Sequence, residues 1–313
     1  MSHKLLLPIL ALTLAMVVCQ IQFATPTQAP ATVPIPSNTP VPPAPTDTPV
    51  PPTPTALSGL TLDMLRNGTY NAPAFGKTVK LVNGAYSGAD SYSVLMLDTV
   101  AFGDLNGDGV VDAAILLVES GGGSGAFVSL IPVLNLAGAP SQAGQVQLGD
   151  RVQVTAMKIA SSAVSLDMVV PGPNDPLCCP SQPETQTYQM IGNTFWMTHV
   201  TSTTPDNHER SITINTPAQN ADVTNPFTIS GSVTIAPFEN TLAYRVYLPD
   251  GTKVNESPQD VDSGGIMGGP GTFTRQVDLG NAGITGPVIF QFLDLSAADG
   301  SIMAMGSVVL NVH

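Results

Sequence analysis

The stretch Phe227-Thr-Ile-Ser-Gly-Ser-Val-Thr-Ile235 alternates apolar residues with small or polar ones. Successive side chains of a β-strand point to opposite faces of a sheet, so this pattern predicts a strand with one face in a core. The pattern returns between turn residues at 211–216, 242–248, 272–277, 288–293 and 307–312, with a short extra strand around 253–256. About seven short strands in roughly a hundred residues are typical of an immunoglobulin-like sandwich, which we predict over residues 211–313.

The region before this sandwich is also predicted to be rich in strands. Charged residues make up only 11% of the chain, while Gly and Pro number 29 each, and this composition favours strands and turns over helices. Because residues 201–210 are polar and have no apolar period, we end a first β-rich domain, residues 57–200, near residue 200. The predicted fold class is therefore all-β. The expected strands lie at 78–82, 92–97, 113–118, 127–134, 152–159, 165–170 and 187–191, with one short helix at 60–66.

The N-terminal residues have the composition of an export signal. Lys4 supplies a positive charge, and residues 5–18 form an apolar run that ends at Cys19. Such a run is too short to span a bilayer comfortably but matches the core of a signal peptide. Residues 1–19 thus resemble the signal and lipobox of bacterial lipoproteins, which implies a lipid on the Cys19 thiol. Because Met16-Val17-Val18 departs from the usual lipobox, cleavage elsewhere or an uncleaved anchor are the alternatives.

Residues 20–56 are predicted to be a linker rich in proline and threonine. Residues 24–56 contain twelve Pro and eight Thr, a composition that favours extended polyproline II and cannot bury a core. We therefore expect an exported protein, held through its lipid at the extracellular face of the cell membrane or secreted. The net charge of −13 would repel nucleic acid, so we expect no nucleic-acid partner.

One loop has the pattern of a calcium site. Positions 1, 3, 5 and 9 of this loop carry side chains with oxygen atoms, those of Asp104, Asn106, Asp108 and Asp112. Position 6 is Gly, and the backbone carbonyl of Val110 would serve as the ligand at position 7. The missing carboxylate at position 12 excludes an EF-hand. The loop and its flanks resemble a single FG-GAP repeat of β-propeller proteins such as integrin α chains. We expect structural Ca²⁺ here; the alternative is a polar turn without metal.

Two adjacent cysteines form a second unusual feature. Cys178 and Cys179 are the pair that remains once Cys19 is assigned to the lipid, and Pro176 and Pro180 flank them. In an oxidising compartment an even pair favours a disulfide, here between neighbours. Buried thiols, intermolecular bonds and metal binding are the alternatives.

Seven segments of the second domain carry a resemblance to a known family: 217–226, 229–231, 236–240, 244–247, 250–251, 271–273 and 295–301. Through these segments the domain resembles the Gmad2 domain, an immunoglobulin-like module named from bacterial spore-germination proteins. The match covers nearly the whole hundred residues, although the module that commonly accompanies it, GerMN, is not found. The resemblance implies an envelope-associated structural or interaction module and no catalytic residues.

The sequence offers few residues for catalysis. There are only four histidines, and neither a Gly-x-Ser-x-Gly nor a His-Glu-x-x-His motif occurs. We therefore expect a non-catalytic, surface-tethered binding or scaffold protein whose partner is another envelope protein or a polysaccharide. The alternative is a cell-wall or polysaccharide hydrolase, with residues 57–200 catalytic and the sandwich as its targeting module, because paired carboxylates leave little local signature.

Overall fold

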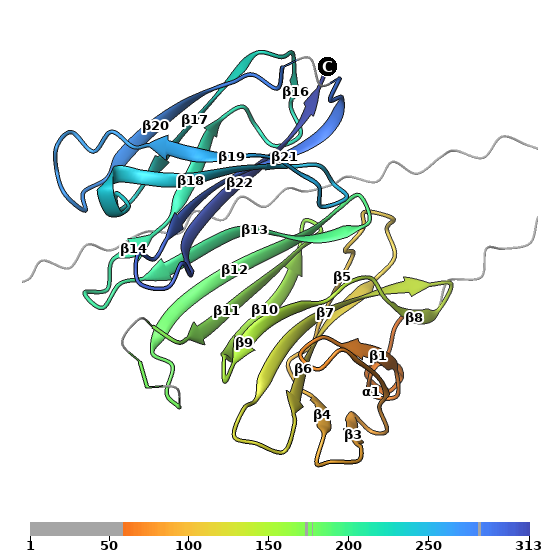
Figure 1. The fold of residues 1–313 in the computed structure, drawn as a ribbon. Coiled ribbons are helices and arrows are strands. Elements are labelled where there is room, and N and C mark those ends of the chain that lie inside the picture. The colour runs from red at the N-terminus through yellow and green to blue at the C-terminus, as the bar shows by residue number, and fades with distance from the viewer. Residues whose placement is uncertain (1–58, 173–174, 177, 281–282) are drawn as a thin grey trace, which may run out of the picture. The chain divides into compact units, whose positions relative to one another are not determined.

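The computed structural model describes residues 59–172, 175–176, 178–280 and 283–313. The predicted signal and lipobox with Cys19, and the linker of residues 20–56, lie outside these residues. The described part is nearly all strand, so the predicted all-β class is confirmed (Figure 1). No helix of the described part is long and apolar enough to cross a membrane.

The first half of the described chain builds a hairpin and a seven-stranded sheet. The hairpin pairs β1 with β2 and follows the short helix α1. The sheet has the order β3-β4-β6-β7-β8, with β5 on β6 and β9 on β7. The bounds are α1 Leu62–Arg66, β1 Thr69–Ala72, β2 Lys77–Lys80, β3 Ala85–Ser87, β4 Ser93–Met96, β5 Ala101–Gly103, β6 Asp112–Ser120, β7 Phe127–Leu136, β8 Ala139–Gln142 and β9 Val146–Asp150.

A ten-stranded sheet continues from the first half of the chain into the second. Its main path is β10-β11-β12-β13-β22-β21-β18-β19, with β14 on β13 and β16 on β22. The bounds are β10 Gln153–Ala160, β11 Ala163–Val170, β12 Gln182–Ile191, β13 Thr194–Thr203, β14 Glu209–Arg210, β16 Asp222–Val223, β18 Thr241–Tyr247, β19 Lys253–Asp260, β21 Gly286–Leu295 and β22 Ile302–Val312.

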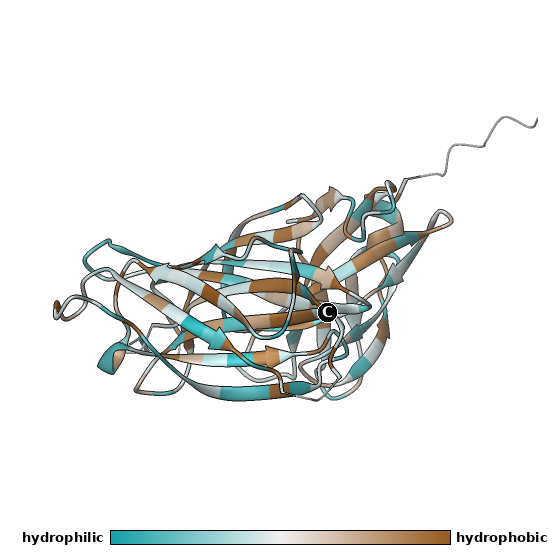
Figure 2. Ribbon diagram, turned by 90° about the horizontal axis from the view of Figure 1, so that it is seen from above, coloured by the Kyte–Doolittle hydropathy of each residue, from teal (hydrophilic) through white to brown (hydrophobic). Residues whose placement is uncertain are grey.

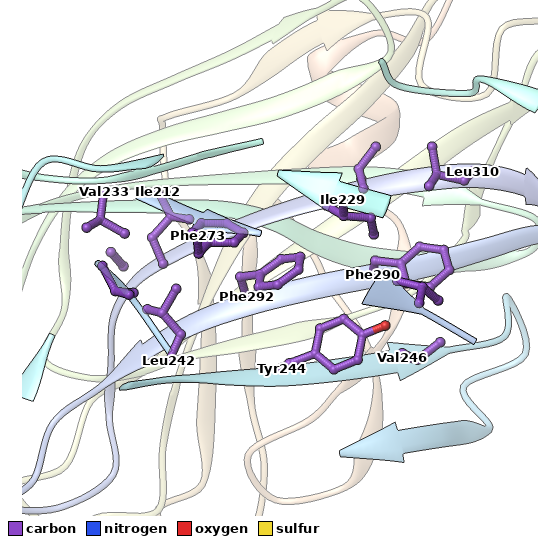
Figure 3. Close-up of a cluster of buried hydrophobic side chains, with 14 of the residues drawn as sticks. Ile212, Ile229, Val233, Leu242, Tyr244, Val246, Phe273, Phe290, Phe292 and Leu310 are labelled. Carbon is purple, nitrogen blue, oxygen red and sulfur yellow. The ribbon is translucent and has the colours of Figure 1, made fainter. Parts of the chain in front are cut away.

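The predicted sandwich is present in the second half of the chain. A three-stranded sheet of β15 (Ile212–Thr216), β17 (Phe227–Val233) and β20 (Gly271–Val277) faces β18, β21 and β22. Figure 3 shows side chains of both sheets meeting in one core, with Phe273 of β20 against Phe292 of β21 at 4.6 Å between ring centroids. Along the strands hydrophobic and hydrophilic residues alternate (Figure 2), as the sequence pattern predicts.

Strand β6 is buried on both faces. Ala113, Ile115 and Leu117 pack with the hairpin side of the sheet, whereas Ala114 and Leu116 pack with β10, β11 and β12. All five side chains are fully buried, which explains why this strand is a continuous apolar run instead of an alternating one. The first half of the chain is therefore layered around β6 and its neighbour β7.

The two halves of the chain are joined by the pairing of β13 with β22. His199 lies opposite Gly306 and Val200 opposite Met305 in an antiparallel register. The polar stretch 201–210, which we expected to separate two domains, instead contains the end of β13 and all of β14. The sheet therefore runs across the predicted boundary.

Side chains strengthen this junction on both strands. The Ser202 hydroxyl donates to the Met303 carbonyl at 2.6 Å, and the Ser307 hydroxyl donates to the Thr198 carbonyl at 2.8 Å. Small apolar clusters also span the junction, one of which contains Val200 together with Leu293 and Met305. The side chains of Ser202 and Ser307 thus reinforce the strand pairing here.

The junction generates a test at Gly306. A Cβ atom there would lie 2.7 Å from the carbonyl oxygen of Ile212, which is backbone and cannot rotate away. Gly306→Ala should therefore lower the free energy of unfolding by about 1–3 kcal/mol, the usual cost of overpacking. Urea denaturation followed by circular dichroism measures this change. Gly123→Ala is the matched control, because nothing lies within 4 Å of that position, and equal stability of the two variants would contradict the close approach.

Candidate binding groove

The predicted calcium loop is folded around Asp104. One oxygen of its carboxylate accepts the N–H of Gly107 at 2.7 Å, and the other accepts the N–H of Gly109 at 2.9 Å. Both glycines have φ of 80°, the left-handed region that glycine adopts readily. The bonds from Gly109, Gly107 and neighbouring amides hold the pKa of Asp104 below its usual range. The turn is thus built from carboxylate-to-backbone bonds.

Asp112, the predicted ligand at position 9, lies in the interior. Its side chain is fully buried, and its two oxygens accept the N–H groups of Leu105 at 2.9 Å and Asn135 at 2.8 Å. Asp112 therefore ties both ends of the loop to β7. Asn106 turns its amide N–H toward Asp108, at 2.9 Å.

Among the five predicted ligands, Asp112 is buried, Asp104 is half-buried and Asp108 is exposed. Among the described residues no group of three or more His, Cys, Asp or Glu side chains is placed to hold a metal ion. Asp104 and Asp112 both accept backbone N–H groups on their two carboxylate oxygens, and Asp108 is the exposed carboxylate of the loop. Calcium binding stays a prediction.

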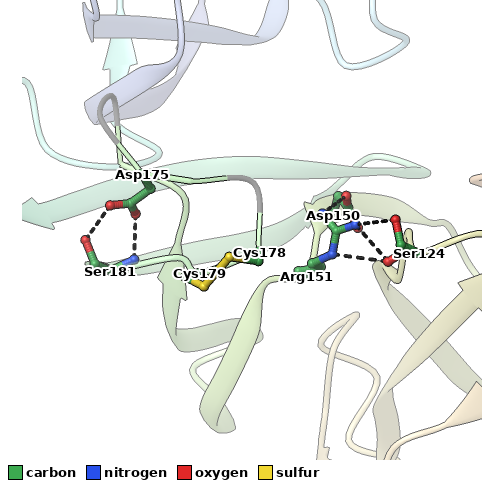
Figure 4. The surroundings of a disulfide bond; sticks show 7 residues. All are labelled: Ser124, Asp150, Arg151, Asp175, Cys178, Cys179 and Ser181. Carbon is green, nitrogen blue, oxygen red and sulfur yellow. Dashed lines mark hydrogen bonds and ion pairs between the residues drawn. A yellow bond between two sulfur atoms is a disulfide. The ribbon is translucent and has the colours of Figure 1, made fainter.

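Cys178 and Cys179 form a disulfide with each other in the loop between β11 and β12 (Figure 4). Both residues are exposed. Asp175 closes this loop by accepting the N–H of Gly172 and the N–H of Ser181, each at 2.7 Å. The bond from Gly172, followed by those from Ser181, lowers the pKa of Asp175. Of the four possibilities weighed for this cysteine pair, the structure contains the disulfide between neighbours.

A groove that the sequence did not predict opens among the loops of the sandwich. It has a volume of about 630 Å³ and lies between the segment after β17, the β19–β20 loop and the β21–β22 turn. The segment after β17 includes the 3₁₀ helix η1 (Phe238–Asn240). Most of the lining is apolar; its larger members are Ile235, Pro237, Phe238, Met267, Leu295 and Met303.

Backbone hydrogen bonds hold the groove's loops in place. The N–H of Ala236 donates to the carbonyl of Gly269 at 2.7 Å, and the N–H of Val261 donates to the carbonyl of Asn240 at 2.8 Å. Glu239 and Asn240 both have positive φ, 55° and 53°, so the chain turns sharply there. The walls of the groove are therefore cross-linked to each other and do not depend on a ligand for their shape.

A buried ion pair forms the polar part of the groove. Asp294 of β21 is 2% exposed, and one of its oxygens lies 2.7 Å from Nη1 of Arg210 of β14. Burial raises the pKa of Asp294, and the neighbouring guanidinium opposes that rise. The Nε of Arg210 is buried with no hydrogen-bond partner among the described residues. Arg210 is also the only Lys or Arg among the residues that line the groove.

Three large apolar side chains stand in solvent at or beside the groove. Phe238 is 68% exposed, Ile266 63% and Met267 98%. Phe238 and Met267 belong to the lining, and Ile266 precedes Met267 in the β19–β20 loop. Large apolar groups exposed close to a groove are a common feature of interaction surfaces.

The rim of the groove is acidic. Glu239 belongs to the lining, and Asp299 follows the lining residue Ala298. Both carboxylates are on exposed residues. The groove therefore combines an apolar interior with a negative edge.

The sequence contained a signal for this groove. The segments 236–240 and 295–301, two of those that carry the Gmad2 resemblance, contribute to opposite walls. A second signal is that Phe238 and Ile266-Met267 are large apolar residues within stretches of turn-forming Pro, Gly and Asn. The sequence could not reveal that these loops line the same groove, because their positions in space are set by the strands that separate them in the sequence.

Comparison with known proteins supports the assignment of the second half of the chain. Residues 211–301 match the family model of Gmad2, the immunoglobulin-like domain of bacterial spore germination. No curated protein matches the chain, and no solved structure matches it. Residues 211–301, which supply nearly all of the groove, are a Gmad2 immunoglobulin-like domain.

Proposed function

We propose that this chain is a non-catalytic binding protein of the bacterial cell envelope that captures a partner in the groove of its Gmad2 domain. The observation that carries the proposal is the exposure of Phe238 and Met267 at a preformed apolar groove. Burying one such side chain contributes about 1.5–3 kcal/mol, so a partner that covers both gains substantial binding free energy.

The fixed loops support the same proposal. Because backbone bonds from Ala236 and Val261 already hold the walls, binding would cost little conformational entropy on this side of the interface. Two of the charged groups within the groove, Arg210 and Asp294, form an ion pair with each other. The lining contains neither His nor Cys.

Placement in the envelope rests on three features of the chain. The apolar run that ends at Cys19 is typical of an exported precursor. The disulfide of Cys178 with Cys179 is typical of an oxidising compartment. The Gmad2 family takes its description from bacterial spore germination, which does not by itself assign this chain to that process.

Site-specific photocrosslinking tests the groove in living cells. A benzoylphenylalanine in place of Phe238 should crosslink the full-length protein to a partner. The matched control carries the same group in place of Val82, which is 63% exposed on the first half of the chain. We expect roughly tenfold more crosslinked product at position 238, the ratio that corresponds to about 1.4 kcal/mol of preference. Equal yields at the two positions would contradict the proposal, and release of soluble fragments from peptidoglycan by the purified protein would favour the hydrolase.

Anchoring by lipid has its own test. Cys19→Ser removes the thiol that a diacylglyceryl group would occupy, so it should move the protein out of the membrane fraction and abolish labelling by a palmitate analogue. Cell fractionation and in-gel fluorescence measure both effects, with Cys178→Ser as the control that keeps the label. A wild-type protein that takes up no label would exclude lipidation.

Calcium binding by the loop is tested by thermal unfolding. Ca²⁺ at hundredfold excess over Kd should raise the unfolding midpoint by about 5–10 °C, with a chelator reversing the rise. Extracellular sites often bind at about 10⁻⁴–10⁻³ M, so the titration extends to about 10 mM. Asp108→Ala should remove the rise. Asp112→Ala should lower the midpoint even without calcium, because it leaves two buried N–H groups without their acceptor. A flat wild-type titration would leave the loop as a metal-free turn.

A further inference from the structure

We infer that the groove of the Gmad2 domain recognises a protein segment in which an apolar anchor residue is flanked by lysine or arginine. This inference rests on the proposed function and adds the chemistry of the partner. It follows from two properties of the same surface, an apolar interior and an acidic rim. One ligand must complement both.

The interior selects an apolar anchor. The lining includes the flexible side chains of Leu295, Met303 and Met267. The thioether groups of the two methionines can adapt to anchors of different shape. A volume of about 630 Å³ lies in the range of ordinary ligand pockets and can take one or two large apolar side chains. A polysaccharide has no large apolar side chain to insert beside Phe238 and Met267, so a protein segment fills this interior better.

The rim selects positive charge beside the anchor. Glu239 in the lining and Asp299 beside it are exposed, and no lysine belongs to the lining. The one arginine, Arg210, is already paired with Asp294 and so cannot offset the rim. Complementary charge at a rim steers association and discriminates between partners more than it adds affinity.

The same charges disfavour two other occupants. An anionic membrane surface attracts basic segments, whereas this rim is acidic and the chain carries a net charge of −13. A peptide with acidic flanks would place like charges against Glu239 and Asp299, an arrangement that reduces binding. Exposed Phe238 and Met267 therefore point to a protein partner with basic flanks and not to lipid insertion.

The test uses three fluorescent peptides and the full-length protein. The peptides KKLFLKK, EELFLEE and KKSGSKK vary the flanks and the anchor separately, and binding is followed by fluorescence anisotropy. We expect KKLFLKK to bind at least about tenfold more tightly than either of the others, a difference of about 1.4 kcal/mol in binding free energy. The reason is that EELFLEE reverses the charge of the flanks and KKSGSKK lacks the apolar anchor. Raising NaCl from about 0.05 M to about 0.5 M should weaken this binding without abolishing it, because salt screens the rim and spares the apolar contact.

Variants assign the binding to the groove. Phe238→Ser should weaken KKLFLKK strongly, since it removes an apolar wall. Glu239→Lys should weaken the same peptide by about two- to fivefold, the usual range for an exposed charge pair, and strengthen EELFLEE. Asp63→Lys makes the same charge change on the short helix α1, outside any proposed site, and should leave the binding of both peptides unchanged. Circular dichroism confirms that each variant is folded.

Several outcomes would overturn the inference. Equal binding of KKSGSKK would mean general charge attraction, and tighter binding of EELFLEE would mean that the groove selects acidic partners. Binding to vesicles of phosphatidylglycerol that Phe238→Ser abolishes would mean that the occupant is lipid. If no peptide binds while the crosslink at position 238 persists, the partner chemistry is wrong and the proposed function stands. If both fail, the groove is not a binding site.

Discussion

The pairing of β13 with β22 is the constraint on which the other features of this structure depend. Two register pairs, His199 with Gly306 and Val200 with Met305, join the first half of the chain to the Gmad2 domain in one ten-stranded sheet. Hydroxyl bonds from Ser202 and Ser307 reinforce the pairing, because they satisfy carbonyls on the facing strand. Without this pairing β13 and β22 would each present an open edge, and the junction would behave as a flexible linker.

The groove depends on the same junction. Arg210 follows directly from the end of β13 through β14 and reaches Asp294 on β21, so one ion pair belongs both to the junction and to the groove. A buried pair of this kind contributes little net stability but is costly to break, because the remaining charge would be stranded in the interior. The polar part of the groove thus depends on Arg210, which lies outside the matched segment 211–301, as well as on Asp294 within it. A Gmad2 domain excised at its sequence boundary would lose that arginine.

Alternating and apolar strands could be predicted from the sequence, while the elements that join them could not. The strands of the sandwich, and β6 and β7 before it, have patterns that burial alone produces. The second half of β13 is rich in Thr and Ser, and it forms a strand because β12 pairs with it along its length and β22 adds two register pairs on its other edge. Asp112 was predicted as a metal ligand from spacing, since nothing in the sequence shows that Asn135 on the next strand donates to it. Phe238 and Met267 meet only because three loops converge at one end of the sandwich.

Strand β22 has a consequence for the kinetics of folding. It comes last among the strands in sequence order, yet it pairs with β13, β21 and β16. The bond from Ser202 to Met303 spans 101 residues, and contacts of such long separation form slowly because a large loop must close first. In a chain synthesised from its N-terminus, β13 can pair with β12 and β21 with β18, but one edge of each strand stays unpaired until residues 302–312 arrive. During that interval the open edges can pair with strands of other chains. The outer strand β19 is itself an edge of the sheet, and its Pro258, Lys253 and Glu256 disfavour such pairing there. Because β22 follows the strands with which it pairs, the ten-stranded sheet can be completed only after residues 302–312 have been synthesised.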